Sequence, residues 1–441
     1  MKETTKPRDS FATKWGFRLA CIGSAVGMGN IWLFPYRLGQ LGGAAFLIPY
    51  ILWVVLLGQT GLVGEMTLGR SMKSGPLGAF GKTTALRGKG EKLGEGIAVV
   101  PVLGGLALAM GYSVVLGWIL KYLWGSITGS VLASESIGAY FGGTASSFGS
   151  VGWHLLGLAI TFAVMLFGIQ GGIEKMNKVM IPLFYALFLV LAVRVFTLGN
   201  ASAGYRYLFV PDWSALLQVK TWVYALGQAF FSLSLAGTGT VVYGSYLRED
   251  QDIPASARTI ALFDTLAALL AALVIIPAVF AYGLDPASGP PLMFITMPTV
   301  FQQMPGGSVF MIVFFVAVLL AALTSLVNLF ETPIEALQTY FGLGRKPAVG
   351  IVAAVSAAVG VCIEGIVSSW MDVCSIYLCP LGALMAAVML FWVCGSKYAR
   401  EHAQRGAARP LGKWFEPAGK YVFCGVTLLV LVLGILYGGI G

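Results

Sequence analysis

The feature that most constrains this 441-residue chain is a series of apolar runs long enough to cross a lipid bilayer as helices. A bilayer core needs about 20 apolar residues per helical span. Eleven runs meet this requirement, at 15–40, 43–70, 94–126, 153–171, 177–199, 222–246, 256–283, 306–341, 347–367, 370–395 and 419–438. Only 11% of the residues are charged, against about 25% in soluble proteins, which disfavours a soluble enzyme or a nucleic-acid-binding protein. We expect an all-α membrane protein with eleven transmembrane helices.

The basic residues predict how the chain is oriented. All but five of the 28 Lys and Arg residues lie before the first run or in every second loop; the five are Arg37, Lys121, Arg194, Arg206 and Lys220. Because cytoplasmic loops of membrane proteins are enriched in Lys and Arg, we expect a cytoplasmic N-terminus. An odd number of helices then puts the C-terminus outside the cell. No signal-peptide pattern precedes the first run, so we expect all eleven runs in the mature protein.

Two of the runs contain residues that interrupt a helix. Residues 23–30 of the first run hold three glycines and an asparagine, and residues 232–240 of the sixth run mix glycine with hydroxyl side chains. Non-helical backbone is stable at membrane depth only where it is buried in protein or lines a cavity. Interruptions five runs apart predict two five-helix repeats of inverted topology, 15–199 and 222–395. Helices 1 and 6 would be unwound at mid-membrane, with a binding site where they meet.

Short stretches at matching helix positions resemble the signatures of helices 1, 2, 6 and 8 of the neurotransmitter:sodium symporter family. They are Ala25–Tyr36 (AVGMGNIWLFPY) followed by Gly42–Tyr50 (GGAAFLIPY), Glu65–Arg70 (EMTLGR), Gly227–Ser234 (GQAFFSLS) and Ala321–Ser325 (AALTS). The bacterial amino-acid transporters of the leucine transporter type are the kin that they resemble most. Many family members have twelve helices, whereas this chain has eleven runs. The resemblance implies symport of an amino acid with sodium, and therefore a carrier rather than an enzyme.

The resemblance also implies two sodium sites made of oxygen ligands, which suit a hard cation. The first site would use protein oxygens together with the substrate carboxylate. Its protein ligands would be the Ala25 carbonyl, the Asn30 side chain, the Ser232 carbonyl and hydroxyl, and the Asp264 carboxylate. The second site would use only main-chain and hydroxyl oxygens. Its ligands would be the carbonyls of Gly23, Val26 and Ala321 and the hydroxyls of Thr324 and Ser325.

Asp264 is the most informative single residue, because a carboxylate in the middle of an apolar helix costs about 2.5–3.5 kcal/mol on insertion scales. The family commonly has asparagine at this position. We hypothesise that Asp264 supplies a fixed negative charge near the first sodium, where animal members use chloride, so transport should be independent of chloride. Two alternatives stay open. Asp264 is a helix-end acid facing the cytoplasm near Asp250 and Asp252, or it takes up a proton when sodium leaves and allows proton counter-transport.

The resemblance assigns the substrate's charged ends to main chain and hydroxyl groups. The carboxylate would face Gly29 at the start of the outer half of helix 1, the first sodium and the Tyr112 hydroxyl. The ammonium would meet the carbonyls of Ala25, Phe231 and Ser232 and the Ser234 hydroxyl. The side-chain pocket would be lined by Leu108, Phe231, Ser234, Gly237, Ser325 and Leu329. Few of these are charged, and Gly237 replaces a bulky aromatic, so large aliphatic or aromatic L-amino acids are expected.

The outer gate departs from the family pattern. Family members usually have an arginine before the Phe-Pro of helix 1, paired with an aspartate in helix 10. This chain has Leu33 at the arginine position and Arg37 one turn later on the same helical face, while the aspartate is present as Asp372. We therefore expect an Arg37–Asp372 gate on the outside.

The inner gate is implied by Arg8 and Phe11, which match the family's N-terminal latch. The acidic partner of this latch is replaced by Thr339, so Glu335, one turn earlier, would have to take its place. Ordinary interfacial side chains are the alternative for all these gate residues. The expected divisions are the cytoplasmic latch at 1–14, the repeats, an extracellular loop at 200–221, a cytoplasmic loop at 396–418, and the eleventh helix with an extracellular C-terminus at 419–441.

Three other functions compete with the sodium symporter. A proton-coupled amino-acid carrier of the same architecture is the nearest, and sodium dependence of binding separates the two. A channel or receptor is disfavoured because no filter-like ring is found. An intramembrane enzyme is disfavoured because His154 and His402, the two histidines, lie at the ends of apolar runs. The expected location is the bacterial inner membrane, with a hydrophobic amino acid and lipid as partners and no nucleic acid.

Overall fold

The computed structural model describes residues 10–235, 238–286 and 292–440, which form helices and connecting segments without a strand among them. The expected all-helical fold class is confirmed in these residues. The α-helices of the first half are α1 (Lys14–Ala25), α2 (Phe34–Gln40), α3 (Ala44–Leu57), α4 (Val63–Met72), α5 (Pro76–Ala85), α6 (Glu91–Thr128), α7 (Ile137–Thr144), α8 (Val151–Leu166), α9 (Lys175–Phe196), α10 (Ser202–Phe209) and α11 (Trp213–Leu216).

The second half continues in the same way. Its α-helices are α12 (Val219–Ser232), α13 (Gly239–Ser245), α14 (Ile253–Ala281), α15 (Met297–Gln303), α16 (Gly307–Phe341), α17 (Arg345–Ile363), α18 (Val367–Val373), α19 (Cys379–Val388), α20 (Ser396–Ala403), α21 (Phe415–Pro417) and α22 (Cys424–Tyr437). Short π or 3-10 turns join several of them. They are η1 (Gly29–Leu33), η2 (Gly58–Leu62), η3 (Ile169–Glu174), η4 (Leu292–Thr296), η5 (Glu364–Ile366), η6 (Cys374–Leu378), η7 (Met389–Gly395) and η8 (Ala418–Phe423).

Within the described residues, seven helices are long and apolar enough to span a membrane, or eight when a bent pair counts as one span. The seven are Ala44–Met72, Glu91–Thr128, Ile169–Phe196, Ile253–Ala281, Gly307–Phe341, Arg345–Ala403 and Phe415–Tyr437, and the bent pair joins Lys14–Ala25 to Gly29–Gln40. The expected count of eleven also needs α8, which has 16 residues. To reach eleven, α12 and α13 must together count as one further span. The continuous Arg345–Ala403 stretch of 59 residues must also count as two spans.

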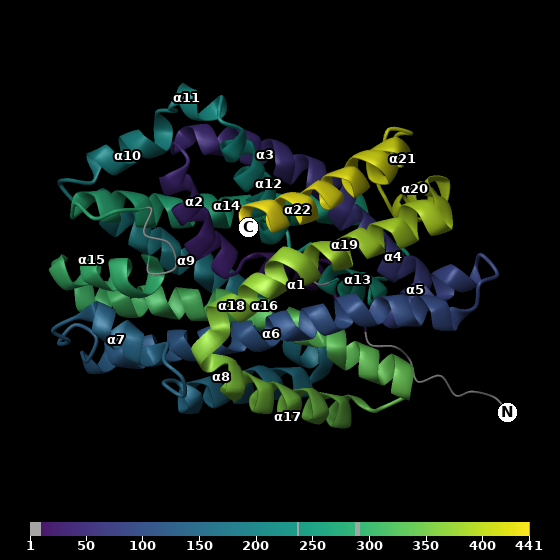
Figure 1. The fold of residues 1–441 in the computed structure, drawn as a ribbon, viewed down its shortest axis with the longest axis horizontal. Coiled ribbons are helices and arrows are strands. Elements are labelled where there is room, and N and C mark those ends of the chain that lie inside the picture. Colours follow the sequence, from purple (N-terminus) through teal and green to yellow (C-terminus); the bar gives the residue numbers. More distant parts are fainter. Residues whose placement is uncertain (1–9, 236–237, 287–291, 441) are drawn as a thin grey trace.

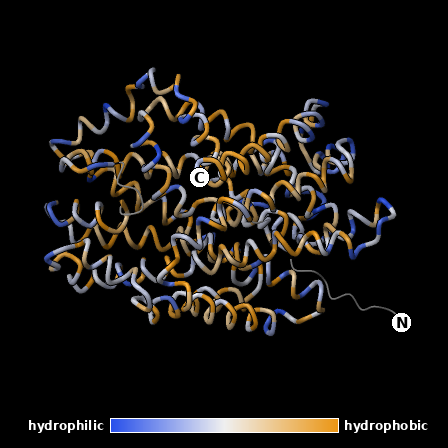
Figure 2. The backbone as a smooth tube through the Cα atoms, viewed as in Figure 1, coloured by the Kyte–Doolittle hydropathy of each residue, from blue (hydrophilic) through white to orange (hydrophobic). Residues whose placement is uncertain are grey.

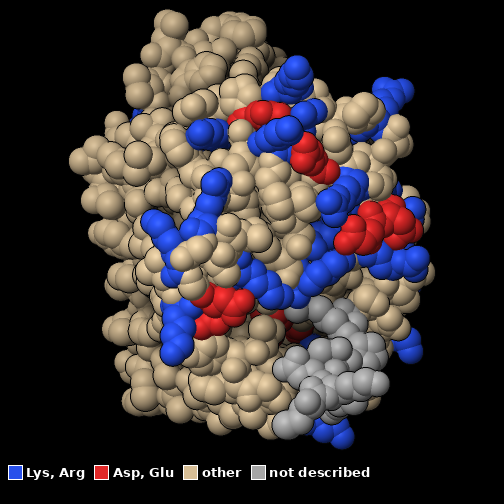
Figure 3. Space-filling view, turned by 90° about the vertical axis from the view of Figure 1, so that its right-hand side faces the viewer, with Lys and Arg blue, Asp and Glu red and all other residues tan. Residues whose placement is uncertain are grey.

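Most of the helices run along the longest axis of the molecule (Figure 1). Hydrophobic residues predominate along the middle of this axis, and hydrophilic residues gather in the loops at its two ends (Figure 2). One of these ends carries many Lys and Arg side chains around α4, α5 and α20 (Figure 3). Lys73 forms an ion pair with Glu249 there at 3.2 Å. The hydrogen bond and positive charge of Lys73 lower the pKa of the Glu249 carboxyl below its ordinary value.

The centre of the molecule is built by helices from both halves of the chain. The longest helices, α6 and α16, pack against each other, and α16 also contacts α1, α9 and α13. The beginning of α14 is fixed by Asp252, which accepts a hydrogen bond from the Ala255 amide at 2.8 Å, and by Pro254 in the first turn. This packing brings residues 23–30 close to residues 232–235 and to the middle of α14.

Candidate functional site

The helix that begins at Lys14 stops at Ala25, inside the glycine-rich stretch expected to interrupt it. Val26 is extended (φ −71°, ψ 103°), and the helical residues resume at Gly29 after a bend of 51°. The Asn30 side chain supports the bend, since its Oδ1 accepts a hydrogen bond from the Gly27 amide at 3.0 Å. Main-chain groups around residues 23–29 are thereby released from helical bonding.

The second interruption follows α12, which ends at Ser232. Ser234 (φ 54°) and Thr238 (φ 57°) have left-handed backbone conformations, which non-glycine residues adopt at a cost of about 1–3 kcal/mol. Helix α13 begins at Gly239. The predicted pocket residue Gly237 lies outside the described residues. Two left-handed residues this close together indicate that the surrounding packing holds the chain open here.

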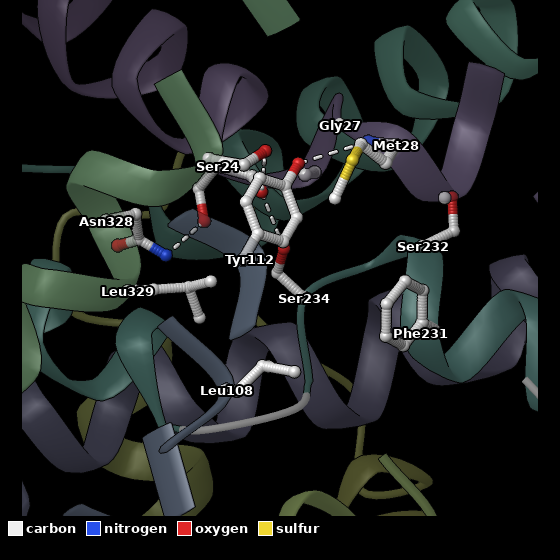
Figure 4. A pocket seen from close by; sticks show the side chains of 13 residues that line it. Ser24, Gly27, Met28, Leu108, Tyr112, Phe231, Ser232, Ser234, Asn328 and Leu329 are labelled. Atoms are coloured by element: carbon white, nitrogen blue, oxygen red, sulfur yellow. Dashed lines mark hydrogen bonds between the residues drawn. The ribbon is translucent and has the colours of Figure 1, made fainter. Parts of the chain in front are cut away.

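A cavity of about 40 Å³ lies where the two interruptions meet. Nine of the predicted substrate residues are described, and all nine line it: Ala25, Gly29, Leu108, Tyr112, Phe231, Ser232, Ser234, Ser325 and Leu329. The Tyr112 ring stands in its centre, with its hydroxyl accepting from the Met28 amide at 3.2 Å (Figure 4). Ser234 donates to the Ser24 carbonyl at 2.7 Å, which ties the two interrupted stretches together.

A buried carboxylate lies beside this cavity. Asp264 is fully buried within α14, with one oxygen accepting from Asn30 Nδ2 at 2.7 Å and the other from the Ser232 hydroxyl at 2.8 Å. The Tyr50 hydroxyl lies 3.4 Å from the Ser232 hydroxyl. In the described part of the chain, no Lys or Arg lies within 4.0 Å of the Asp264 carboxylate. A buried carboxylate with neutral partners alone is costly, so this cluster fits a bound cation.

A second group of oxygens gathers at Ser325 on α16. The hydroxyl of Ser325 lies 3.2 Å from the carbonyl oxygens of Gly23 and Ser24 and 3.1 Å from that of Val26. One hydroxyl has a single proton, so three carbonyls at this distance leave a surplus of acceptors. Thr324, the neighbouring residue, donates to the Ala321 carbonyl at 3.0 Å. Oxygen acceptors in excess of donors are the chemistry of a hard-cation site, and these residues fit sodium.

A larger cavity of about 340 Å³ continues from the small one, and the two share Met28, Gly29, Tyr112 and Phe231. Both residues of the expected outer gate, Arg37 and Asp372, line it. They do not form an ion pair with each other within the described residues. The Arg37 guanidinium instead lies over the Tyr224 ring at 4.1 Å from its centroid, a favourable cation–π position. The two expected gate residues therefore line the same cavity without closing it by an ion pair.

Aromatic packing surrounds Phe11, a residue of the expected inner gate, near the start of α1. Phe11 is buried, with its ring centroid 5.3 Å from that of Phe17 and 5.6 Å from that of Tyr243. Glu335 is also buried and accepts hydrogen bonds from the Gly75 amide at 2.8 Å and from Thr339 Oγ1 at 2.7 Å. Arg8, the expected partner of Glu335, lies outside the described residues.

The structure adds residues at the site that sequence reasoning missed. Asn328 on α16 donates to the Ser24 hydroxyl, and Gln228 on α12 donates to the Gly29 carbonyl at 3.1 Å. Away from the lining of the cavity, Glu65, noted only as part of a motif, is buried and accepts a hydrogen bond from Thr240 in α13. The sequence feature that could have predicted these residues is an amide or carboxylate side chain inside an apolar run, because such groups are stable in a membrane only with polar partners.

Two interrupted helices around a cavity with surplus main-chain acceptors and a buried carboxylate define a membrane transporter site. The sequence model of the "Sodium:neurotransmitter symporter family" matches residues 8–141 and 139–437, and the chain belongs to this family. The predicted family resemblance is confirmed. Its homologues are sodium-dependent transporters and not enzymes, as the sequence indicated.

Individual relatives agree with the family match. The sodium-dependent transporter YhdH of Bacillus subtilis (strain 168), itself uncharacterized, is 40% identical over 324 residues, covering 73% of this chain and 70% of the relative. The uncharacterized sodium-dependent transporter MJ1319 of Methanocaldococcus jannaschii is 32% identical over 436 residues, covering 93% and 87%. The crystal structure of MhsT in complex with L-phenylalanine has a TM-score of 0.84 and 33% identity, covering 96% of this chain and 99% of that one.

Proposed function

We propose that this chain imports large aliphatic or aromatic L-amino acids together with sodium by alternating access, without a requirement for chloride. The observation that carries the proposal is the juxtaposition of two cation-fitting oxygen clusters with one small cavity at the paired helix interruptions. A cation held against the carboxylate end of a zwitterion offsets the negative charge of that carboxylate in a low-dielectric interior. Binding of one therefore favours binding of the other.

The two proposed sodium sites differ in charge. The first, around Asn30, Ser232 and Asp264 with the Ala25 carbonyl, contains a carboxylate that offsets the ion's charge. This charge is our reason for proposing chloride independence. The second, formed by the carbonyls of Gly23, Val26 and Ala321 with the hydroxyls of Thr324 and Ser325, is made of neutral oxygens.

The preference for hydrophobic substrates rests on the apolar side of the cavity. Leu108, Phe231 and Leu329 line it, with Tyr112 and Ser234 available to the charged ends of an amino acid. The complex of MhsT with L-phenylalanine supports an aromatic substrate for a related fold. The small cavity has the volume of a few water molecules at most, so it must widen into the larger one to accept such a side chain.

Alternating access would use the gates at the two ends of the site. Substrate arrival would draw Arg37 from the Tyr224 ring toward Asp372 and close the outside. Release of the packing at Phe11, together with Arg8 and Glu335, would open the inside. We place the N-terminal latch, 1–14, on the cytoplasmic side, in agreement with the basic residues gathered near that end (Figure 3).

The proposed topology is eleven spans in the bacterial inner membrane, with helices 1 and 6 unwound and the C-terminus outside. The repeats are 15–199 and 222–395, joined by an extracellular loop at 200–221. A cytoplasmic loop at 396–418 and the eleventh helix at 419–441 follow. The bent pair Lys14–Ala25 and Gly29–Gln40 and the gap between α12 and α13 support the two unwound positions.

Equilibrium binding of labelled phenylalanine to the purified protein tests the proposed function. We expect binding in sodium and at least tenfold less in potassium, with no effect of replacing chloride by gluconate. Unlabelled tryptophan and leucine should compete, and glycine should not, because the apolar lining discriminates by about 1–3 kcal/mol per group. Equal binding in potassium at acidic pH would favour the proton-coupled carrier, and strong glycine competition would contradict the substrate class.

The Ser325→Ala variant tests the second sodium site. It removes the hydroxyl that lies 3.2 Å from the Gly23 carbonyl and 3.1 Å from the Val26 carbonyl, and we expect the sodium concentration for half-maximal binding to rise about tenfold. Ser126→Ala is the matched control, because the Ser126 hydroxyl is equally buried and bonds only within its own helix, to the Tyr122 carbonyl at 2.6 Å. A control shift as large as that of Ser325→Ala would contradict the assignment.

A further inference from the structure

A histidine and a glutamate that the proposed transport cycle does not use face each other near the start of α8. His154, in the first turn of α8, and Glu364, in η5, are both buried. His154 Nδ1 and Glu364 Oε1 lie 3.9 Å apart, and neither atom has a hydrogen-bond partner among the described residues. A hydrogen bond between them would need about 2.7–3.2 Å, so the two atoms stand roughly 1 Å too far apart.

The other hydrogen bonds of the two side chains indicate that both facing atoms are acceptors. The Ser113 hydroxyl donates its single proton to the Met110 carbonyl at 2.7 Å, so it accepts from His154 Nε2 at 2.9 Å. A neutral imidazole with its proton on Nε2 has a lone pair on Nδ1. Glu364 Oε2 accepts from the Ser150 amide at 3.2 Å. One added proton between Nδ1 and Oε1 would therefore give both atoms a partner.

Two glycines leave the space that the imidazole occupies. A Cβ atom at Gly360 on α17 would lie 2.3 Å from His154 Cε1, and one at Gly117 on α6 would lie 2.7 Å from the His154 Cα. Both helices therefore come too close to His154 for a side chain larger than that of glycine. This packing restricts rotation of the ring away from Glu364, so the unpartnered Nδ1 atom stays directed at the carboxylate.

Lys121 on α6 is a cationic group that acts on the pair. Its Nζ donates to the Gly149 carbonyl at 3.0 Å, and its positive charge interacts with the Glu364 carboxylate. Because this charge offsets that of the carboxylate when no proton is bound, the pair can exist with and without a proton. Other titratable side chains on the elements packed against α8 and η5 include Tyr112 and Tyr122 on α6, Glu174 in η3, Glu331 on α16, Arg345 and Cys362 on α17, and Asp372 on α18.

A proton can reach the pair from the larger cavity of the site. Glu364 lines a further cavity of about 200 Å³. This cavity and the larger one share the residues Trp32, Trp118, Val367 and Ser368. The larger cavity is also the one that the expected outer gate lines. The pair therefore adjoins the same side of the site as the outer gate.

The segment that follows the pair connects it to the substrate cavity. Helix α18 comes directly after η5, and its Trp370 Nε1 donates to the Ala107 carbonyl of α6 at 2.7 Å. A Cβ atom at Gly111 would lie 2.5 Å from Met371 Sδ, so α18 also packs closely on α6 at this point. The residues directly after Ala107 and Gly111 line the small cavity. A shift of η5 toward α8 would therefore be transmitted to the substrate-binding side of α6.

We propose that His154 and Glu364 form a proton-binding site, and that proton binding draws η5 and α18 toward α8 and strengthens amino-acid binding. The proton closes the gap between the two facing acceptors by forming the missing hydrogen bond. The movement brings α18, which carries Asp372, closer to α6 and narrows the larger cavity. The proton stays at this pair as a regulator and is distinct from the counter-transported proton considered for Asp264. Only the effect on amino-acid binding rests on the proposed function.

Phenylalanine binding to the purified protein at about pH 5 and about pH 8 tests the site, with saturating sodium so that Asp264 stays occupied by the ion. We expect the parent to bind about fivefold more tightly at the lower pH, a typical coupling between two linked sites. Glu364→Gln places an amide donor opposite Nδ1, so it should bind at both pH values as the parent does at the lower pH. His154→Leu removes the acceptor and should bind at both as the parent does at the higher pH.

The matched control is His402→Gln, because His402 is the other of the two histidines and stacks on Tyr398 in α20 with ring centroids 3.8 Å apart. This variant should keep the pH response of the parent. An equal pH response in the parent and in His154→Leu would overturn the inference. A uniform loss of affinity in both variants of the pair at both pH values would also overturn it, because a purely structural role predicts that result.

A second measurement needs no amino acid. Ser368 lines both outer cavities, so Ser368→Cys can be labelled with a membrane-impermeant maleimide in a Cys362→Ser protein, which lacks the exposed native thiol. Dividing the labelling rate by that of the same cysteine in the His154→Leu protein corrects for the pH dependence of the thiol. We expect this ratio to be about fivefold lower at the lower pH, and an unchanged ratio would contradict the inference. If the parent binds no phenylalanine in sodium, the proposed function fails, whereas this ratio still tests the proton site.

Discussion

The Asp264→Asn variant is expected to need about a hundredfold more sodium than the parent for half-maximal amino-acid binding. The substitution preserves the size of the side chain but removes the carboxylate that is hydrogen-bonded to Asn30 and Ser232 in the buried cluster. Hydrogen bonds and contacts to a charged group contribute about 1.5–3 kcal/mol, and about 2.7 kcal/mol corresponds to a hundredfold change. Chloride should restore part of the lost sodium affinity in the variant. A chloride ion bound near the sodium would supply the negative charge that the Asp264 carboxylate provides in the parent.

Sodium titrations of phenylalanine binding, in chloride and in gluconate, measure this effect. Asp212→Asn is the matched control, because Asp212 caps α11 in an exposed loop by accepting from the Ser214 amide at 3.0 Å. The control should bind as the parent does in both salts. The hypothesis of a fixed charge would be wrong if Asp264→Asn bound at the parent sodium concentration with no response to chloride.

Removing Arg345 is expected to destabilise the folded protein by about 3–5 kcal/mol. The Arg345 guanidinium makes two hydrogen bonds to the Glu331 carboxylate, at 2.9 and 2.8 Å, and Tyr246 donates to the same carboxylate at 2.8 Å. Glu331 is fully buried, so Arg345→Ala would leave an uncompensated charge inside the protein. The double variant Arg345→Ala with Glu331→Gln should regain part of the stability, because it removes that charge.

Thermal unfolding of the purified variants in detergent, followed by tryptophan fluorescence, tests the pair. Lys397→Ala is the control, since Lys397 and Glu401 are an exposed pair at 4.0 Å, and such pairs contribute about 0–1 kcal/mol. We expect the control to unfold close to the parent temperature and Arg345→Ala to unfold well below it. Equal unfolding temperatures for the parent and Arg345→Ala would show that the buried pair does not stabilise the fold.

The sequence predicted the site best at residues that are rarely found in the middle of a membrane helix, such as clustered glycines and a lone carboxylate. Glycines at 23, 27 and 29 predicted a break in the first helix, and α1 does end at Ala25. Asp264 stood out as a lone carboxylate in an apolar run, and it is buried beside the cavity rather than at a helix end. These features are local, so their positions along the chain suffice to find them.

Features that depend on packing between distant helices could not be predicted in the same way. The facing atoms of His154 and Glu364 depend on how α8 lies against η5. Arg37 and Asp372 were expected to pair, but the guanidinium lies over Tyr224, because an aromatic ring nearby competes for the same charge. The position of Arg37 on its helix does not by itself determine which of two nearby partners its long side chain contacts.

We propose above all that open main chain in helices 1 and 6 holds a sodium ion and an amino acid side by side. An experimental structure of the protein in sodium with bound phenylalanine tests this most directly. We predict density for an ion within coordinating distance of the Asp264 carboxylate and of the amino-acid carboxylate, with the phenyl ring between Leu108 and Leu329. Phenylalanine bound elsewhere, with Asn30, Ser232 and Asp264 still bonded only to one another, would contradict the claim.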